Sequence, residues 1–370
     1  MNLVQLYIAK TSNAFKGSCS FTAVVLNVLL SYGINKHLCC LLFFLATTAT
    51  KSIAQDLHYT QYVNAPLNLN PANTFNDADY RFVLNNRSQW KAVTVPYKTF
   101  SLSADIKAFG IGQFQPNTAF GILVNNDVAG DSKLQTTNFT GSFAYQFTFD
   151  KKAANYITAG VQFGYTQKSF DLTALTFNNQ FNGDVFDPSA PTGEPVTNDQ
   201  MSYFDLGLGF NGQWTQSKKL RFNFGAAVQH INKPDNSFYS LGTVKISPHY
   251  IASAGVIYQL KENLQLIPTM LFMQQNTTAQ VDINANLKYG LSAYKLPITN
   301  VYGGAGLRIK DAISLNLGAD VKNLFVGVSY DINTSPLRTA SNGRGAIEFA
   351  VIYKIFKIRP LPQAPPCIIY

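Results

Sequence analysis

Residues 220–229, with the sequence LRFNFGAAVQ, decide the fold because apolar side chains alternate along them with polar or small ones. Side chains of a β-strand point in turn to its two faces, so this stretch forms a strand with one apolar and one polar face. The same alternation recurs in residues 280–289 and 344–356. A soluble sandwich also contains such strands, so the pattern alone does not decide between a sandwich and a membrane barrel.

The number and length of these strands favour a barrel, because the chain offers them no helices to pack against. In lipid, a sheet that closes on itself pairs all its backbone groups without leaving an edge, and its apolar face contacts acyl chains. We therefore predict an all-β fold, a single transmembrane outer-membrane β-barrel of about 14 antiparallel strands. It occupies residues 79–356, and its predicted strands are 79–89, 97–108, 117–128, 135–149, 154–170, 201–215, 219–232, 243–259, 263–276, 280–289, 298–309, 312–321, 323–333 and 344–356.

The lengths of the connections agree with this strand order. If both ends of the barrel lie in the periplasm, every connection from an odd to an even strand lies outside the cell. These connections include the long ones, residues 171–200, 232–242 and 333–343, whereas most connections on the other side are short. Bacterial barrels show this asymmetry of long outer loops and short periplasmic turns.

The composition fits a wall that faces lipid. Charged residues make up only 13% of the chain and aromatic residues also 13%, with 19 Tyr and 28 Phe. A cytosolic enzyme usually carries about twice that share of charge. Removing the four leader lysines (Lys10, Lys16, Lys36 and Lys51) leaves 25 cationic against 20 anionic residues, a net charge of +5. This charge is spread rather than clustered, which argues against a nucleic-acid partner.

Residues 1–54 are predicted to be a leader with a secretory signal peptide. Lys36 and His37 precede an apolar run, and small residues follow up to Ala54, so we expect the mature chain to begin at Gln55. Two explanations remain for residues 1–35: the leader is unusually long, or the translation start was assigned too early.

No catalytic, cofactor or metal site is expected. The chain has no GxSxG, HExxH or P-loop motif, and Cys367 is the one cysteine that follows the leader. The histidines are scattered, which favours loop or lumen positions over metal ligation. Acidic residues in the 171–200 loop are either solvated or calcium ligands, and their spacing fits no twelve-residue calcium loop. These acids are Asp184, Asp187, Glu194 and Asp199.

Charged residues also lie on the polar face of the predicted strands. The simpler interpretation is that they pair across the barrel interior, because the inner wall of such a barrel is polar. The alternative is a selectivity constriction. The residues are Asp105, Lys107, Asp205, Arg221, Asp282, Lys288 and Asp320.

Two irregular segments flank the predicted barrel. Residues 55–78, QDLHYTQYVNAPLNLNPANTFNDA, are rich in Asn and Pro and lack sustained periodicity. We predict a loop or short-helix segment on the periplasmic side, preceding the barrel. Residues 357–370 form a proline-rich tail, which forms neither a helix nor a central strand and is also expected in the periplasm.

A family resemblance rests on motifs at both ends of the barrel. The opening motifs are Gln55-Asp56, Tyr59-x-Gln61-Tyr62, Pro66-Leu67 and Asn70-Pro71-Ala72, followed by Tyr80-Arg81, Asn86-Arg87, Gln89-Trp90 and residues 97–103; residues 343–353 continue the pattern near the end. In these motifs the chain resembles the PorP/SprF-type outer membrane proteins of the type IX secretion system. The middle of the chain matches only as a generic barrel.

The resemblance implies a non-enzymatic outer membrane component that supports export or surface retention of large proteins, gliding adhesins included. Its expected partners are membrane lipid, other secretion components on the periplasmic face and secreted cargo on the outer face. Two alternatives remain: a porin-like channel for small solutes, and an outer membrane enzyme, for which no nucleophile and base are found.

Seven residues near the start are the candidates for partner binding. Their alternative role is structural: Asn70-Pro71-Ala72 turns the chain into the first strand, and Trp90 anchors an aromatic girdle at the membrane interface. The candidates are Gln61, Tyr62, Asn70, Pro71, Ala72, Arg87 and Trp90.

Overall fold

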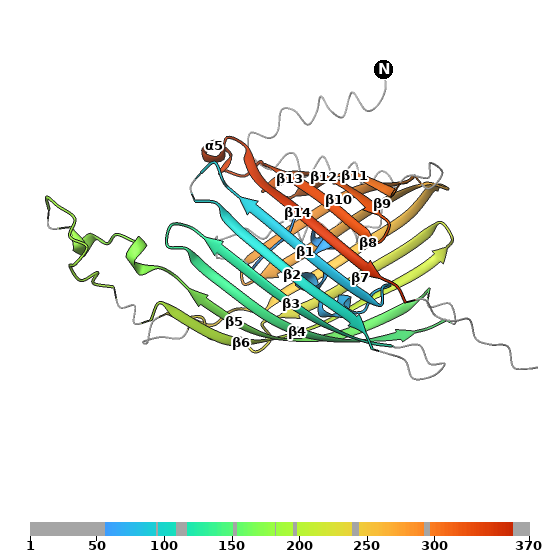
Figure 1. Cartoon of the computed structure of the whole chain (residues 1–370), viewed down its shortest axis with the longest axis horizontal. Helices are drawn as coiled ribbons and strands as arrows, with labels where there is room; N and C mark the ends of the chain where they lie inside the picture. The colour runs from blue at the N-terminus through green and yellow to red at the C-terminus, as the bar shows by residue number, and fades with distance from the viewer. Residues whose placement is uncertain are drawn as a thin grey trace, which may run out of the picture. The chain divides into compact units, whose positions relative to one another are not determined.

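The computed structural model describes residues 56–93, 95–108, 117–150, 154–181, 183–194, 198–238, 244–291 and 297–357. In these residues fourteen antiparallel strands form a closed barrel, each paired with its neighbours in sequence and β1 paired with β14 (Figure 1). This confirms the predicted barrel and its strand number. The strands are β1 (Tyr80–Gln89), β2 (Tyr97–Lys107), β3 (Thr118–Ala129), β4 (Leu134–Thr148), β5 (Tyr156–Ser169), β6 (Gln200–Ser217), β7 (Leu220–Gln229), β8 (His249–Lys261), β9 (Leu264–Gln275), β10 (Thr278–Gly290), β11 (Ile298–Arg308), β12 (Ala312–Val321), β13 (Leu324–Asn333) and β14 (Arg344–Ile355).

The two ends of the barrel differ in their connections. We call the end where β1 begins and β14 ends the terminal end, and the opposite one the long-loop end. Residues 218–219, 262–263 and 322–323 are tight turns at the terminal end. The long-loop end carries the connection from β5 to β6, which contains η3 (Leu172–Ala174) and η4 (Asn178–Gln180), and the connection from β13 to β14, which contains α5 (Arg338–Ser341).

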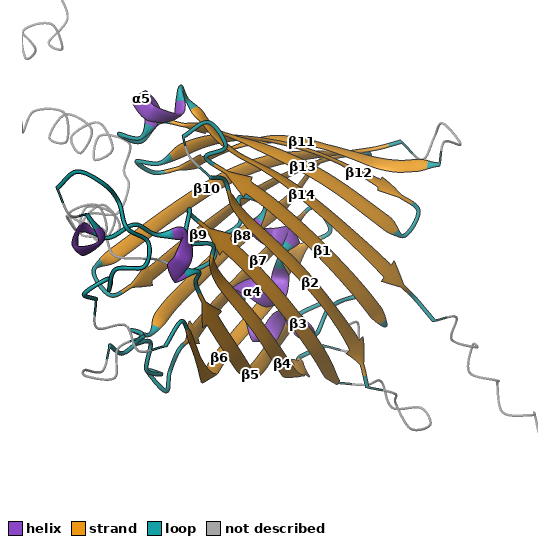
Figure 2. Cartoon of the chain, turned by 60° about the vertical axis from the view of Figure 1, so that its left-hand side comes forward, coloured by secondary structure: helices purple, strands orange, loops and turns teal. Residues whose placement is uncertain are grey.

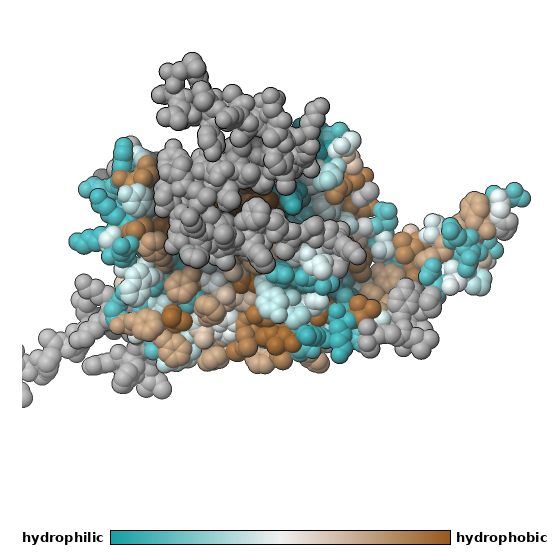
Figure 3. Space-filling view, turned by 180° about the vertical axis from the view of Figure 1, so that it is seen from behind, coloured by the Kyte–Doolittle hydropathy of each residue, from teal (hydrophilic) through white to brown (hydrophobic). Residues whose placement is uncertain are grey.

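The alternation in sequence matches the two faces of the wall. Phe222 and Phe224 are exposed on the outside, whereas Gly225 and Ala227 on the other parity of β7 are buried. In β10, Ile283 and Leu287 are exposed and Asp282 is buried. Apolar side chains spread over the visible part of the outer wall (Figure 3). An outward apolar face and an inward polar face are what a barrel in lipid requires.

No helix among the described residues is long and apolar enough to cross a membrane. Residues 1–54, for which a leader was predicted, lie outside the described residues, as do Gln55 and residues 358–370 of the tail.

The irregular segment before β1 lies inside the barrel. It contains η1 (Tyr62–Asn64), α4 (Pro66–Leu69) and η2 (Pro71–Thr74), which occupy the space within the ring of strands (Figure 2). We call residues 56–78 the plug. The segment does form short helices, but the expectation that it precedes the barrel on the periplasmic side is corrected: the wall surrounds it. The physical reason is that its Asn, Thr and Gln side chains and its main chain find hydrogen-bond partners on the polar inner wall.

Candidate functional site

The plug is buried against strands on all sides of the lumen. Its own side chains are largely inaccessible, with Ala72 and Thr74 fully buried. Hydrogen bonds join it to strands far apart in sequence, from Asn85 of β1 and Asn125 of β3 to Gln229 of β7. A segment without regular structure needs such partners, because buried backbone groups without hydrogen bonds are costly.

Proline and asparagine shape the two helical turns at the centre of the plug. Pro66 and Pro71 occupy the first positions of α4 and η2, where the missing backbone N–H costs nothing. The Asn70 side chain accepts from the backbone N–H of Ala72 at 2.9 Å and so caps η2. Its amide nitrogen donates to the carbonyl oxygens of Phe210 at 2.8 Å and Ala226 at 3.1 Å. One side chain therefore both starts a helical turn and ties it to β6 and β7.

Inward glycines of the wall leave room for this turn. A Cβ atom on Gly160 would lie within 3.0 Å of the backbone of Pro71 and Ala72, and a Cβ atom on Gly209 would overlap the Asn70 side chain. Backbone atoms cannot move aside as a flexible side chain can. The glycines of β5 and β6 are therefore required for close approach of the plug to the wall.

A buried ionic cluster holds the first part of the plug to the strands that close the barrel. Arg87 of β1 lies 3.0 Å from Glu348 of β14 and 2.9 Å from Asp331 of β13. Arg308 of β11 lies 3.3 Å from Asp331 and 3.2 Å from Asp282 of β10. Each charge thus has an opposite partner, which a buried charge requires.

The plug completes this cluster with hydrogen bonds. The backbone N–H groups of Thr60 and Gln61 donate to the two carboxylate oxygens of Glu348 at 2.8 and 3.0 Å. The Thr60 hydroxyl donates to Asp331, at 2.9 and 2.8 Å from its two oxygens, and accepts from Arg308 at 2.9 Å. Hydrogen bonds to charged groups are the stronger kind, about 1.5–3 kcal/mol each.

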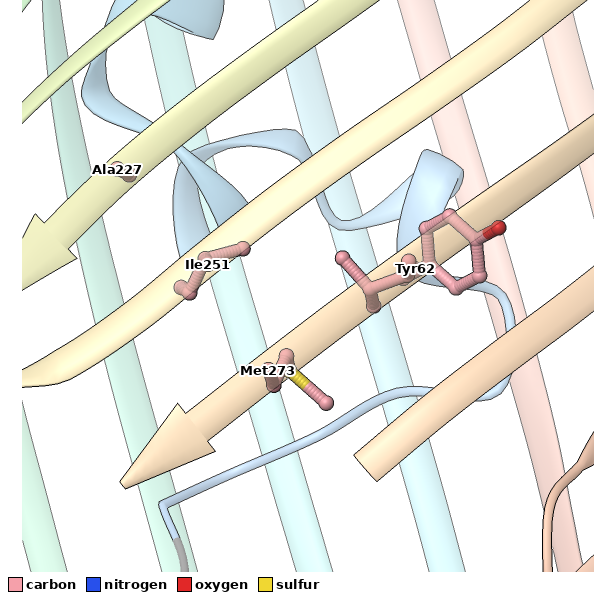
Figure 4. Close-up of a cluster of buried hydrophobic side chains, with 5 residues drawn as sticks. Tyr62, Ala227, Ile251 and Met273 are labelled. Atoms are coloured by element: carbon pink, nitrogen blue, oxygen red, sulfur yellow. The ribbon is translucent and has the colours of Figure 1, made fainter. Parts of the chain in front are cut away.

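Tyr62 forms an apolar contact between the plug and the opposite wall. Its ring packs in a cluster with Ala227, Ile251, Leu271 and Met273, the inward side chains of β7, β8 and β9 (Figure 4). Its hydroxyl donates to the Thr269 hydroxyl at 2.8 Å. The aromatic ring therefore packs among apolar side chains while its hydroxyl group remains hydrogen-bonded.

Asp56 anchors the start of the described plug among histidines. Its carboxylate lies 2.7 Å from Nε2 of His230 and 3.3 Å from Nδ1 of His249, and it accepts from Gln275 at 2.9 Å. Burial alone would raise the pKa of Asp56, but the two histidines outweigh burial and hold that pKa well below its ordinary value. Burial alone would lower the pKa of His230, just beyond β7, but Asp205 and Asp56 raise it to about 10.

Six of the seven sequence candidates meet at the interface between plug and wall. Gln61, Tyr62, Asn70, Pro71 and Ala72 are buried plug residues, and Arg87 contacts the plug from β1. Trp90 is not among them: it follows β1 and stacks edge-on against Tyr97, with ring centroids 5.0 Å apart. The expected turn at Asn70-Pro71-Ala72 thus exists, inside the lumen. Binding of a partner to these residues stays a prediction, because in this structure their side chains already contact residues of the barrel wall.

Several residues of the interface were missed from the sequence. Thr60, Asp331, Arg308 and Glu348 carry the ionic cluster, and Gly160 makes room for η2. For the residues in strands, the available signal was their position on the inward face, where a charged residue or a glycine requires an explanation; nothing in the sequence marked Thr60. The lumen charges Asp105, Asp205 and Asp282 pair with Arg81, His230 and Arg308. In the described part of the chain no group of three or more His, Cys, Asp or Glu side chains is arranged to hold a metal ion.

A closed wall with an apolar outer face and a lumen filled by the chain's own residues defines a plugged outer membrane β-barrel. Residues 51–353 match the model of one protein family, described as "Type IX secretion system membrane protein PorP/SprF". The chain belongs to this family, and it is an outer membrane protein of a Gram-negative bacterium. The family consists of secretion components that are associated with other components of the type IX system. No curated protein matches the sequence significantly.

Solved barrels resemble the chain only distantly. The Ralstonia pickettii toluene transporter TbuX has a TM-score of 0.47 at 11% identity, over 80% of this chain and 94% of that one. A monoaromatic hydrocarbon channel, CymD, has a TM-score of 0.44 at 9% identity, over 80% and 93%. A Pseudomonas aeruginosa FadL homologue has a TM-score of 0.42 at 10% identity, over 77% and 92%.

Proposed function

We propose that this barrel is a non-enzymatic scaffold of type IX secretion that supports the export or surface retention of large proteins, gliding adhesins among them. The observation that supports it best is the plug. Residues 56–78 lie in the lumen and are tied to strands around the wall. A barrel whose interior is filled by its own chain offers binding surfaces at its two ends instead of a path for solutes.

The arrangement of the ends supports a division of partners. In bacterial barrels the short turns face the periplasm and the long loops face outward. The terminal end would then face the other secretion components, and the long-loop end would face the secreted cargo. A signal peptide in residues 1–54 directs the chain toward this membrane. The outward-facing apolar side chains of the strands contact lipid.

The porin-like alternative requires an open lumen, so it is tested by conductance. Purified wild-type protein in planar lipid bilayers is expected to give no stable ohmic channel, because residues 56–78 lie in the lumen and bond to strands on several sides of it. A parallel assay measures protein export in cells that lack the gene and in cells complemented with it. Export that fails without the gene, together with a silent bilayer, supports the scaffold. A persistent open channel with unaffected export supports the porin instead.

A further inference from the structure

A cavity of about 580 Å³ lies between the plug and the terminal end of the barrel. Its inner side is formed by the plug residues Thr60–Asn64, and its walls come from β7 to β14. The turn residues Lys322 and Asn323 and the last residues around β14 also line it, which places its opening at the terminal end. This size lies within the range of about 300–1,000 Å³ that is usual for binding pockets. We call this cavity the vestibule.

Apolar side chains project into the vestibule from both the plug and the wall. Val63 of η1 is 58% exposed although it lies inside the barrel. Ile257, Ile267 and Ile352 occupy inward positions of β8, β9 and β14, and Phe325 lies beside them in β13. Inner walls of barrels are otherwise polar. Apolar surface of this kind gains free energy when a ligand removes it from water.

Amide side chains lie between these apolar groups with unused hydrogen-bonding capacity. Within the described part of the chain, no hydrogen bond reaches the side-chain amides of Asn223 and Asn286. Asn316 donates weakly to Asn284 at 3.4 Å, and its own Oδ1 atom is buried without a partner among the residues that the structure describes. Each asparagine amide offers donors and an acceptor together. This is the pairing that the N–H and C=O groups of an extended peptide require.

Most of the charges of the vestibule have partners among the described residues, and Lys322, in the turn at its opening, is the exception. Lys354 pairs with Asp77 at 2.9 Å, and Asp320 accepts from the Tyr302 hydroxyl at 2.8 Å. Lys288 lies over the Tyr302 ring, 5.4 Å from its centroid. A strongly charged ligand therefore finds little unpaired charge. An acyl chain would use the apolar groups but leave the asparagine amides unsatisfied, which is unfavourable.

We propose that the vestibule binds an extended, mostly uncharged polypeptide segment of another component of the secretion system. The segment enters at the terminal end, pairs its main chain with Asn223, Asn286 and Asn316, and places apolar side chains against Val63 and Phe325. The inference rests on the proposed function, because it names the kind of contact through which the scaffold holds its partner. The bound segment touches Thr60–Asn64, so it also meets the part of the plug that is tied to Glu348.

Photocrosslinking in intact cells tests this proposal with neighbouring positions of one strand. Photoreactive benzoylphenylalanine replaces Ile257, which faces the vestibule, or Tyr258, which is exposed on the outer wall. The expected result is an adduct of the Ile257 variant with another polypeptide, mapped by mass spectrometry to one contiguous segment. The Tyr258 variant should give no such adduct. Adducts that stay within the barrel chain, or a small amphiphile found in the purified protein, would overturn the proposal.

A second pair of variants separates this inference from the proposed function. Asn286→Trp fills the vestibule, whereas Leu287→Trp places the same ring on the outer wall. The Ile257 adduct should disappear with Asn286→Trp and persist with Leu287→Trp, with both barrels assembled. An adduct that survives Asn286→Trp overturns the proposed binding in the vestibule but leaves the proposed function standing. Export that survives deletion of the whole gene overturns the proposed function.

Discussion

Arg87 and Glu348 are directly paired residues of β1 and β14, and their side chains lie 3.0 Å apart across the seam that closes the barrel. Arg87 is 2% exposed and Glu348 is fully buried. The same carboxylate accepts hydrogen bonds from the backbone of Thr60 and Gln61. One buried ion pair therefore contributes both to the seam of the wall and to the attachment of the plug.

The first prediction concerns this pair. Arg87→Met leaves the Glu348 carboxylate buried without its cation, and breaking a buried pair from one side costs about 3–5 kcal/mol. We expect a loss of this size in the free energy of unfolding, measured by urea titration of the refolded barrel in micelles. The control is Lys354→Met, because its ion pair with Asp77 is partly exposed and should contribute about 1 kcal/mol or less. Equal losses in the two variants would contradict the role given to the seam.

The second prediction concerns the glycine that faces η2. Gly160→Ala places a methyl group against the backbone of Pro71 and Ala72, and overpacking of this kind costs about 1–3 kcal/mol. We expect faster proteolysis within residues 56–78 in the assembled barrel. Gly141→Ala is the control, since nothing lies within 4 Å of its added carbon. A plug equally protected in both variants would argue against the close approach.

The third prediction tests the two faces of β7. Phe224→Arg places a charge on the lipid side, where Phe224 is 41% exposed, at a cost of about 2–4 kcal/mol near the middle of the bilayer. Asn223→Arg points into the vestibule and should be far milder. The measurement is the yield of assembled, heat-modifiable protein. Equal losses would show that the assigned faces are wrong.

The fourth prediction is a pH dependence of the Asp56 anchor. The pKa of His230 in the folded protein is about 10, above its ordinary value of 6.5. A group whose pKa rises on folding stabilises the fold fully below its unfolded pKa and loses that contribution as the pH rises. Wild-type stability should therefore fall between pH 6.5 and about 10 more steeply than that of His230→Gln. Urea titrations across this window, for both proteins, measure the difference; parallel curves would exclude the effect.

The fifth prediction concerns the start of the mature chain. The signal in residues 36–54 predicts cleavage before Gln55, one residue ahead of the half-buried Asp56 carboxylate. Amino-terminal sequencing of protein extracted from membranes should find Gln55 or a residue close to it. A mature protein that keeps residues 21–30 would refute the leader.

The sequence by itself determined the wall. The period-two alternation of β7 or β10 is a local property, so it gives strand, face and strand number without knowledge of any partner. The ends of the strands were less accurate where a loop continues the pattern: residues 243–248 were predicted as strand, yet β8 begins at His249. For the candidate site, the sequence marked Gln61, Asn70 and Arg87 by resemblance but gave no reason for their burial.

Only the tertiary structure decided that residues 56–78 fill the lumen. This segment has no periodicity from which an inner or outer position can be read, and its partners are remote: Gln61 bonds to Glu348, 287 residues away. A buried carboxylate needs hydrogen-bond donors, and which groups can donate depends on what lies beside it once the barrel has closed. For Glu348 these donors are backbone N–H groups of the plug. The strands therefore follow from local pattern, whereas the plug follows from the polar lumen that those strands create once the barrel is closed.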